Sequence, residues 1–470
     1  MITTPIRPPS KPPAPFCPNR LYPIRVAGQW QMDMGPLAPA LDGYFERTNR
    51  FVHETSYSAS IDGDTFLTNE EDYPAALGAI ADRGGAYVGV GELMSFTYPA
   101  WQGAHHAYAV DRNRDIPLGF VPMYGALLAM AQNRLEFLSL VSGRPIPQDL
   151  RSSPPEGTDY EELIAIAGLY EHDAEFFDIV TAGLTTAIAS RLPEGARRST
   201  DHAVRTWMKR FRNDLAFPKP KLMSEGDWLS YFWNSGARLK LLGLADGQGR
   251  GGTLASEEAF QRERELFLEG RITGVAASLG RGGFELVRAA MGEDEASVVY
   301  LSNVEHMHHQ NLINGSEPGL EEKLLNFYAG LNDLPGAAES LLISADGRRP
   351  TVVSDLMESA DAVYPIGMRA GEGALAFRAL YPLRSAVLKQ LDRPLDERIR
   401  ALFNYPDIDP LLQRLLTHAA SIFHGQRPLR YDEAMGGLIR ECPPFATKMP
   451  PQLRTMFMSN LILLGVVEEM

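Results

Sequence analysis

The chain has 470 residues, of which 44% are apolar and 22% are charged, and its formal net charge at pH 7 is −14. This length allows a full α/β domain plus about one further domain or a large extension. The acidic balance argues against a nucleic-acid partner, because phosphate backbones are held chiefly by basic fields. The longest apolar runs fall short of the roughly 20 residues that cross a bilayer, so we expect no transmembrane segment. The first residues lack the apolar core of a signal peptide, which predicts a cytoplasmic protein.

The predicted elements begin after a proline-rich arm. Prolines are frequent in the first 18 residues, and we expect residues 1–40 to be largely extended or disordered, with folding from Leu41 onward. Helical spacing over 73–81 is followed by a short apolar strand, Ala86 to Val90. A second strand, His106 to Val110, ends at Asp111 and leads into a long helical region over 118–140.

Helix and strand patterns continue to alternate toward the C-terminus. Helices are predicted within 161–192, 199–212 and 257–268, loops over 218–252, strands at 272–277 and 298–303, with further strands at 351–356 and 375–379 and a helical pattern beyond 392. This alternation predicts an α/β fold with a mostly parallel, Rossmann-like sheet. The expected organisation is a domain over 41–390 with a helical and loop insertion at about 150–255, and a helical C-terminal extension over 391–470.

The sharpest motif is the strand Tyr87-Val88-Gly89-Val90-Gly91, which ends in two glycines spaced one apart. Such glycines let the chain turn tightly and bring its backbone against a ligand, although a turn without a ligand has the same pattern. Asp111 ends the next strand, twenty residues after Gly91, where an acid accepts hydrogen bonds from ribose hydroxyls. Met94 stands where a dinucleotide fingerprint has its third glycine, so the pattern favours S-adenosylmethionine over NAD.

Several blocks resemble a little-characterised bacterial family with a methyltransferase-like fold. The resemblance spans roughly residues 43 to 345 and rests on Asn69 to Tyr73, Gly85 to Gly91, Ala107 to Asn113, Arg134 to Ser139 with Gly143-Arg144-Pro145, Val299 to Glu305, and Phe327 to Ala329 with Leu334-Pro335. The strand ends Val110 to Asn113 and Ser302 to Val304 are also similar to those of the betaine-lipid 3-amino-3-carboxypropyl transferases. That similarity implies S-adenosylmethionine as the class of cofactor. The glycine motif and the strand-end block give Tyr87, Gly89, Gly91, Asp111 and Asn113 as its candidate contacts, and the family block before the first strand adds Asn69 and Tyr73.

The candidate catalytic residues follow the strand that begins at Val298. Ligands lie beyond the carboxyl ends of strands in open α/β sheets, which places Asn303 and Glu305 near the reacting groups. Alternatively, Asn303 caps a turn and Glu305 is a solvated helix residue. Within His306-Met307-His308-His309, His306 is a candidate general base. No second ligand group has metal-site spacing, so we expect no metal site.

The sequence thus leads to two hypotheses about the function of the protein. The first is a transferase that moves a methyl or 3-amino-3-carboxypropyl group from S-adenosylmethionine to a small-molecule or lipid-like acceptor. Transfer from a sulfonium needs in-line positioning and a base, because the leaving group is already good. The second is a non-catalytic Rossmann-type binding or scaffold protein, because a fold alone does not decide function.

Overall fold

The structure is a computed structural model, and it describes the N-terminal two thirds of the chain most fully. The described residues are 21–52, 73–91, 93–152, 157–214, 241–279, 282–302, 304, 326–327, 330–331, 333–336, 340–343, 363–365, 429–441, 458, 461–462 and 467–468.

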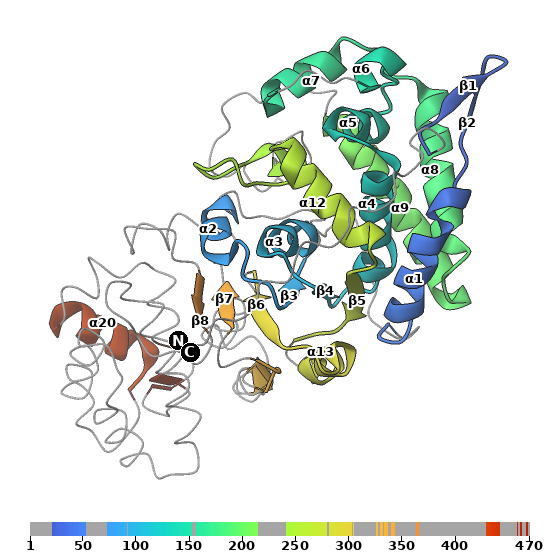
Figure 1. The fold of residues 1–470 in the computed structure, drawn as a ribbon. Helices are drawn as coiled ribbons and strands as arrows, with labels where there is room; N and C mark the ends of the chain where they lie inside the picture. The colour runs from blue at the N-terminus through green and yellow to red at the C-terminus, as the bar shows by residue number, and fades with distance from the viewer. Residues whose placement is uncertain are drawn as a thin grey trace, which may run out of the picture.

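A six-stranded sheet forms the centre of the described part (Figure 1). Its strands, in the order in which they lie side by side, are β5 (Ile272–Ala276), β4 (His106–Asp111), β3 (Ala86–Val90), β6 (Ala296–Tyr300), β7 (Leu341–Ile343) and β8 (Val363–Pro365). The first five are parallel and β8 is antiparallel to β7. The expected α/β class with a mostly parallel sheet is confirmed.

The strand order reverses direction between β3 and β6. From β3 the chain runs outward through β4 to β5, and then crosses back to place β6 on the other side of β3. The residues of β3 and β4 are buried except at the strand ends, as expected for parallel strands covered on both faces. The carboxyl ends of β3, β4 and β6 therefore meet at a topological switch point, where open α/β sheets bind ligands.

The free edge of β5 is covered by the helix α1 (Ala38–Thr48) and the residues after it. Thr48 Oγ1 accepts a hydrogen bond from Gly274 N at 2.9 Å, and Phe51 O accepts one from Ala276 N at 3.1 Å. The Arg47 guanidinium donates to Ile272 O at 3.3 Å. These contacts satisfy the unpaired backbone groups that an edge strand otherwise offers to another chain.

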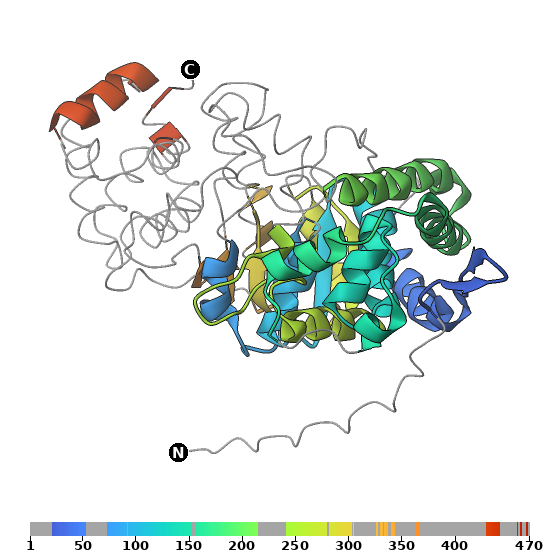
Figure 2. The same cartoon turned by 90° about the horizontal axis from the view of Figure 1, so that it is seen from above.

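Between β4 and β5 the chain builds a thick helical layer. It contains the π-helical turn η3 (Ile116–Phe120) and the helices α4 (Val121–Met130), α5 (Arg134–Ser142), α6 (Gln148–Ser152), α7 (Tyr160–Gly168), α8 (Ala174–Ala189), α9 (Glu194–Asp214) and α12 (Glu257–Leu268). Every residue of α4 and α5 is buried. For α4 this is the state expected of a helix that is apolar all round, whereas α5 also buries Arg134 and Glu136. Figure 2 shows these teal and green helices gathered beside the sheet.

The helix expected over 118–140 is interrupted. Ala131 is extended, and Asn133 caps a new helix by accepting a hydrogen bond from Glu136 N at 2.9 Å. Glu136 in turn accepts one from Gln132 N at 2.9 Å. This reciprocal arrangement is close to a capping box, so the Asn-x-x-Glu pattern in the sequence was the available signal for the break.

The two faces of the sheet carry different helices. The helix α3 (Met94–Gln102) follows β3 and lies between the sheet and α12, with α2 (Leu77–Ile80) and η2 (Tyr73–Ala76) beside it. The helix α13 (Gly283–Met291) packs on the other face, against β4 and β5. Every residue of α3 is buried, so the helix that follows the glycine motif is part of the core.

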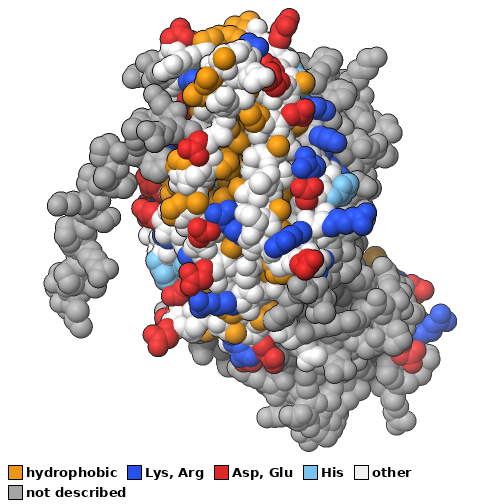
Figure 3. All heavy atoms as spheres, turned by 90° about the vertical axis from the view of Figure 1, so that its right-hand side faces the viewer, with side chains coloured by type: hydrophobic (Ala, Val, Ile, Leu, Met, Phe, Trp, Pro, Cys, Tyr) orange, Lys and Arg blue, Asp and Glu red, His pale blue; other side chains and the backbone are white. Residues whose placement is uncertain are grey.

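Folding begins earlier than the expected boundary at residue 40. Residues 24–31 form a hairpin of β1 (Ile24–Val26) and β2 (Gln29–Gln31), followed by η1 (Gly35–Leu37). Leu21, Tyr22 and Leu37 are buried in the main core. The Trp30 indole donates to Asp173 Oδ2 at 2.9 Å, which ties the hairpin to the start of α8. Figure 3 shows Lys and Arg interspersed with Asp and Glu on this outer side.

Other expected boundaries differ in detail. The strand expected over 298–303 is β6, which ends at Tyr300, and Ser302 after it has a left-handed backbone with φ +50°. The strands expected at 351–356 and 375–379 lie outside the described residues. In the C-terminal extension the structure describes the helix α20 (Tyr431–Glu441). None of the helices in the described part is long and apolar enough to cross a membrane.

Candidate functional site

The predicted glycine turn and the predicted strand-end acid lie next to each other. The strands β3 and β4 pair in parallel with Val90 opposite Val110, so Gly91 and Asp111 are the next residues on each. Gly91 N donates to Val110 O at 3.3 Å. The structure therefore brings Gly91 and Asp111 together at the carboxyl edge, beside the switch point between β3 and β6.

Gly91 has the conformation and the surroundings that a ligand-contacting glycine needs. Its φ of +94° is unfavourable for residues with a side chain. Apart from its neighbours in the chain, no heavy atom of the described residues lies within 4 Å of the place a Cβ would take. Its carbonyl accepts a hydrogen bond from Ser95 Oγ at 2.7 Å, which fixes the turn against the first turn of α3.

Asp111 is half-buried and begins a ladder of side-chain-to-backbone hydrogen bonds. Its Oδ1 accepts from Asn113 N at 2.7 Å, and Asn113 Oδ1 accepts from Asp115 N at 3.2 Å. Such turns are typical of Asp and Asn. They hold the Asp111 carboxylate in one orientation at the strand end. Asn113, by contrast, is buried, and its amide oxygen acts within the loop.

The first glycine of the motif has a packing reason of its own. Tyr87 and Gly89 point to the same face of β3, and a Cβ on Gly89 would overlap the Tyr87 ring. Tyr87 is fully buried, with its ring centroid 6.5 Å from that of Tyr98 in α3. Gly89 therefore admits an aromatic side chain into the core, and of the two glycines only Gly91 faces open space among the described residues.

Tyr73 is also a core residue. Its hydroxyl donates to Leu241 O at 2.7 Å, and its backbone carbonyl accepts a hydrogen bond from Tyr98 Oη at 3.1 Å. Burial raises the pKa of the Tyr73 phenol, with the Glu263 carboxyl adding to the rise. The hydroxyl is thus used to hold the segment at 241–244 against η2.

The remaining sequence candidates lie outside the described residues. These are Asn69 on the binding side and Asn303, Glu305 and His306 on the catalytic side, together with the rest of the histidine cluster. Within the described part of the chain, no group of three or more His, Cys, Asp or Glu side chains is arranged to hold a metal ion.

The histidines at the start of β4 lie at the opposite edge of the sheet from Gly91. His106 Nε2 is 2.8 Å from Thr273 Oγ1, and burial lowers the pKa of His106 to about 4. His105 Nε2 is 3.0 Å from Asp294 Oδ1. The other carboxylate oxygen of Asp294, Oδ2, accepts a hydrogen bond from the Tyr108 hydroxyl at 2.6 Å. These groups stabilise the amino end of the sheet and are remote from the carboxyl edge.

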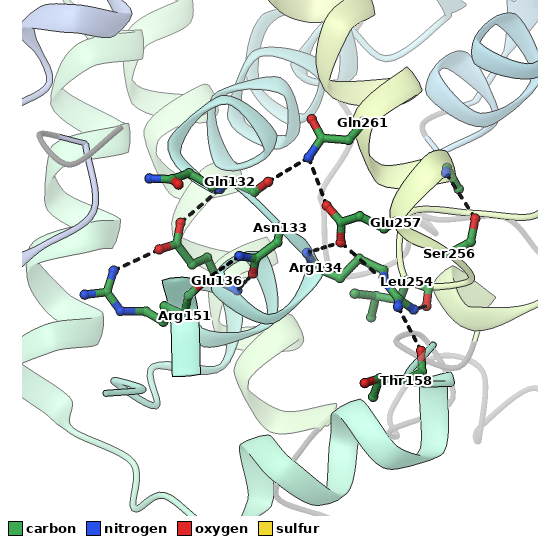
Figure 4. Close-up of polar contacts among 11 residues, drawn as sticks. Gln132, Asn133, Arg134, Glu136, Arg151, Thr158, Leu254, Ser256, Glu257 and Gln261 are labelled. Atoms are coloured by element: carbon green, nitrogen blue, oxygen red, sulfur yellow. Dashed lines mark hydrogen bonds and ion pairs between the residues drawn. The ribbon is translucent and has the colours of Figure 1, made fainter. Parts of the chain in front are cut away.

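The sequence block from Arg134 to Ser139 begins α5 and forms a structural junction (Figure 4). The Arg134 guanidinium donates to Leu254 O at 3.0 Å and to Thr158 O at 2.8 Å, which joins three segments far apart in the sequence. Glu136 accepts from the Arg151 guanidinium at 2.9 Å. The sequence predicted that this block lies near the end of a helix. In the structure it begins α5, and its side chains hold the segments of the helical layer together.

Sequence reasoning missed a buried acid in the same layer. Glu263 of α12 is fully buried and accepts from Thr97 Oγ1 at 2.8 Å, and it also bonds the Thr253 hydroxyl, which contacts Tyr124 Oη. Burial raises the pKa of Glu263 to about 8, although both threonine hydrogen bonds lower it. The helical period of α12 places Glu263 on its apolar side, which was the available signal.

The described structure is thus an α/β protein with a glycine turn and a strand-end acid at its switch point. A family model described as a domain of unknown function (DUF7790) matches residues 65–212. That segment contains β3, β4, Gly91 and Asp111, the helices from α2 to α8, and α9 except for its last two residues. No curated protein matches the chain.

Proposed function

We propose that this protein binds S-adenosylmethionine at the carboxyl edge of β3 and β4 and transfers a carbon group from it to an acceptor. The observation that carries the proposal is the meeting of Gly91 and Asp111 beside the switch point. The order β5-β4-β3-β6-β7 corresponds to the order 3-2-1-4-5 of Rossmann-type sheets. In that fold, nucleosides lie across the first glycine turn, and an acid on the second strand takes the ribose.

The turn after β3 favours a nucleoside without a pyrophosphate. The turn is short, because β3 ends at Val90 and α3 begins at Met94. Leu93 and Met94 are both buried at the start of α3, where a dinucleotide fold keeps its third glycine for close approach of the pyrophosphate. S-adenosylmethionine has no pyrophosphate and so makes no demand for that glycine.

The chemistry asked of the protein is modest. A nucleophile on the acceptor attacks a carbon bound to the sulfonium, the carbon–sulfur bond breaks, and its electron pair goes to sulfur. Catalysis then rests on in-line positioning and on a base that takes the acceptor proton. Asn303, Glu305 and His306, which follow β6 in the chain, remain our candidates for these roles.

Calorimetric titration with S-adenosylmethionine and with NAD tests the cofactor. The variant Asp111→Asn keeps an oxygen for Asn113 N but removes the charge, and we expect its affinity for S-adenosylmethionine to fall about tenfold, because a hydrogen bond to a charged group contributes about 1.5–3 kcal/mol. Asp159→Asn is the matched control, because Asp159 makes a similar backbone hydrogen bond, to Glu162 N, at the start of α7. Equal affinities in both variants would remove Asp111 from the site.

Product analysis tests the reaction class. Transfer of the methyl group releases S-adenosylhomocysteine, and transfer of the aminocarboxypropyl group releases 5′-methylthioadenosine. Lipid extracts and small-molecule pools serve as sources of acceptor. Cofactor binding without either product from any acceptor pool would favour the alternative, a non-catalytic binding or scaffold protein. Tighter binding of NAD than of S-adenosylmethionine would contradict the proposal.

A further inference from the structure

We propose that Asp115, held by two hydroxyl groups of α9, is a positioning residue that fixes the loop in which Asp111 meets the ribose. The inference rests on the proposed function and adds α9 to its site. Asp115 lies four residues after Asp111, in the loop between β4 and η3. The sequence offered no sign that residues near 200 reach this loop.

The loop is joined to Asp111 by successive hydrogen bonds. Asp111 Oδ1 accepts from Asn113 N at 2.7 Å, and Asn113 Oδ1 accepts from Asp115 N at 3.2 Å. Each side chain thus fixes the backbone two residues further along the chain. A shift of Asp115 is therefore passed through Asn113 to the carboxylate of Asp111.

The far end of this ladder is fixed by α9. Asp115 is fully buried, and its Oδ1 accepts from Thr200 Oγ1 at 2.9 Å and from Ser199 Oγ at 3.0 Å. A second tie lies beside it, because the Arg114 guanidinium donates to Gly195 O at 3.2 Å. Two neighbouring loop residues therefore hold the first two turns of the same helix.

The η3 turn after the loop is fixed on two sides. The Tyr44 hydroxyl donates to Pro117 O at 2.5 Å, and a Cβ on Gly119 would lie 2.9 Å from Thr200 Cγ2 and 3.0 Å from the Trp207 ring. Gly119 therefore allows η3 and α9 to approach closely. This close approach places the two hydroxyls within reach of Asp115.

A buried carboxylate is a costly way to join a loop to a helix. An apolar contact of the same size would hold the two surfaces at lower cost. The carboxylate instead accepts charge-assisted hydrogen bonds, which are directional and stronger than neutral ones. The Asp115 carboxylate therefore fixes the position of the loop along α9. Such fixing is needed if the Asp111 side chain is to be held in one orientation.

Thr200→Val tests the inference, because it removes one hydroxyl and keeps the side-chain shape. We expect a fall of about threefold to tenfold in affinity for S-adenosylmethionine, and faster amide hydrogen exchange at Asn113 and Asp115. Thr200→Ser should restore both values. Thr185→Val is the matched control, because the Thr185 hydroxyl is buried on α8 and bonds Thr181 O of its own helix at 2.7 Å.

The outcomes separate the inference from the proposed function. Unchanged exchange at 113–115 in Thr200→Val, or unchanged affinity despite faster exchange, would overturn the positioning role alone. Equal losses of affinity in Thr200→Val and Thr185→Val would also overturn it, because they would reflect general loosening of the helical layer. Failure of the unaltered protein to bind S-adenosylmethionine would overturn the proposed function and this inference with it.

Discussion

Replacing Glu263 with glutamine should change how the stability of the protein depends on pH. The pKa of Glu263 is raised from 4.5 to about 8 by burial, so the folded protein keeps this proton over a range in which the unfolded chain loses it. Because the folded state binds more protons there, its stability falls as the pH rises. The fall is about 1.4 kcal/mol per pH unit, or about 5 kcal/mol between pH 4.5 and 8.

His106 makes the opposite contribution in part of this range. Burial lowers its pKa from 6.5 to about 4, so the unfolded chain takes up a proton that the folded protein refuses, and stability is lost as the pH falls below 6.5. The two effects oppose each other between pH 4.5 and 6.5. Between pH 6.5 and 8 Glu263 acts without His106, and its contribution there is about 2 kcal/mol.

Urea unfolding of the wild type and of Glu263→Gln at several pH values measures the difference directly. Glutamine keeps the shape of the side chain and an oxygen that accepts from Thr97. Its amide has two N–H donors where the protonated carboxyl has one O–H donor, so one buried N–H is left without a partner, which costs about 1–3 kcal/mol at every pH. The variant should therefore be less stable than the wild type at pH 5, and its stability relative to the wild type should rise by about 4 kcal/mol between pH 5 and pH 8. Glu258→Gln, exposed on the same helix and paired with Arg262 at 2.9 Å, is the control. Parallel profiles for the wild type and Glu263→Gln would refute the reasoning.

Two further substitutions test the packing of the core. Gly89→Ala should lower the free energy of unfolding by about 1–3 kcal/mol, because its Cβ displaces the Tyr87 ring. Gly168→Ala in α7 should be neutral or slightly stabilising, because no described atom outside its own helix and chain neighbours lies within 4 Å of the new Cβ. Equal values for the two variants would contradict the packing role of Gly89. Arg134→Met should cost about 2–5 kcal/mol in urea unfolding, because it leaves Leu254 O and Thr158 O without their buried donor, and a loss below 1 kcal/mol would show that the junction is not needed.

The central strands and α12 were predictable from local sequence. The bounds of β3 are those expected, and β4 and β5 differ by one residue, because each is a mainly apolar run next to a glycine or a charged residue. The helix α12 begins after Ser256, whose hydroxyl accepts from Ala259 N at 3.1 Å, an N-cap visible in the sequence. The pairing of Gly91 with Asp111 followed from the rule that parallel strands end at one edge.

What the sequence did not predict depends on contacts between distant segments. The strands β7 and β8 have three residues each, too few for a periodic pattern. The hairpin at 24–31 is held by the hydrogen bond from Trp30 to Asp173 at the start of α8, more than 140 residues away. Whether a glycine of the motif faces a ligand or a neighbouring ring depends on the orientation of Tyr87, which local spacing does not determine.

The segment that matches the family model does not contain the whole of the sheet or of the core around it. Residues 65–212 supply β3 and β4 of the sheet, whereas β5 and β6, which flank this pair, come later in the chain. Its helices also depend on later residues, because Thr97 bonds Glu263 and Arg134 bonds Leu254. Both Gly91 and Asp111 lie inside the segment, but the switch point beside them exists only once β6 has paired with β3. The matched segment therefore carries both Gly91 and Asp111, and the residues after it complete the sheet whose carboxyl edge holds them.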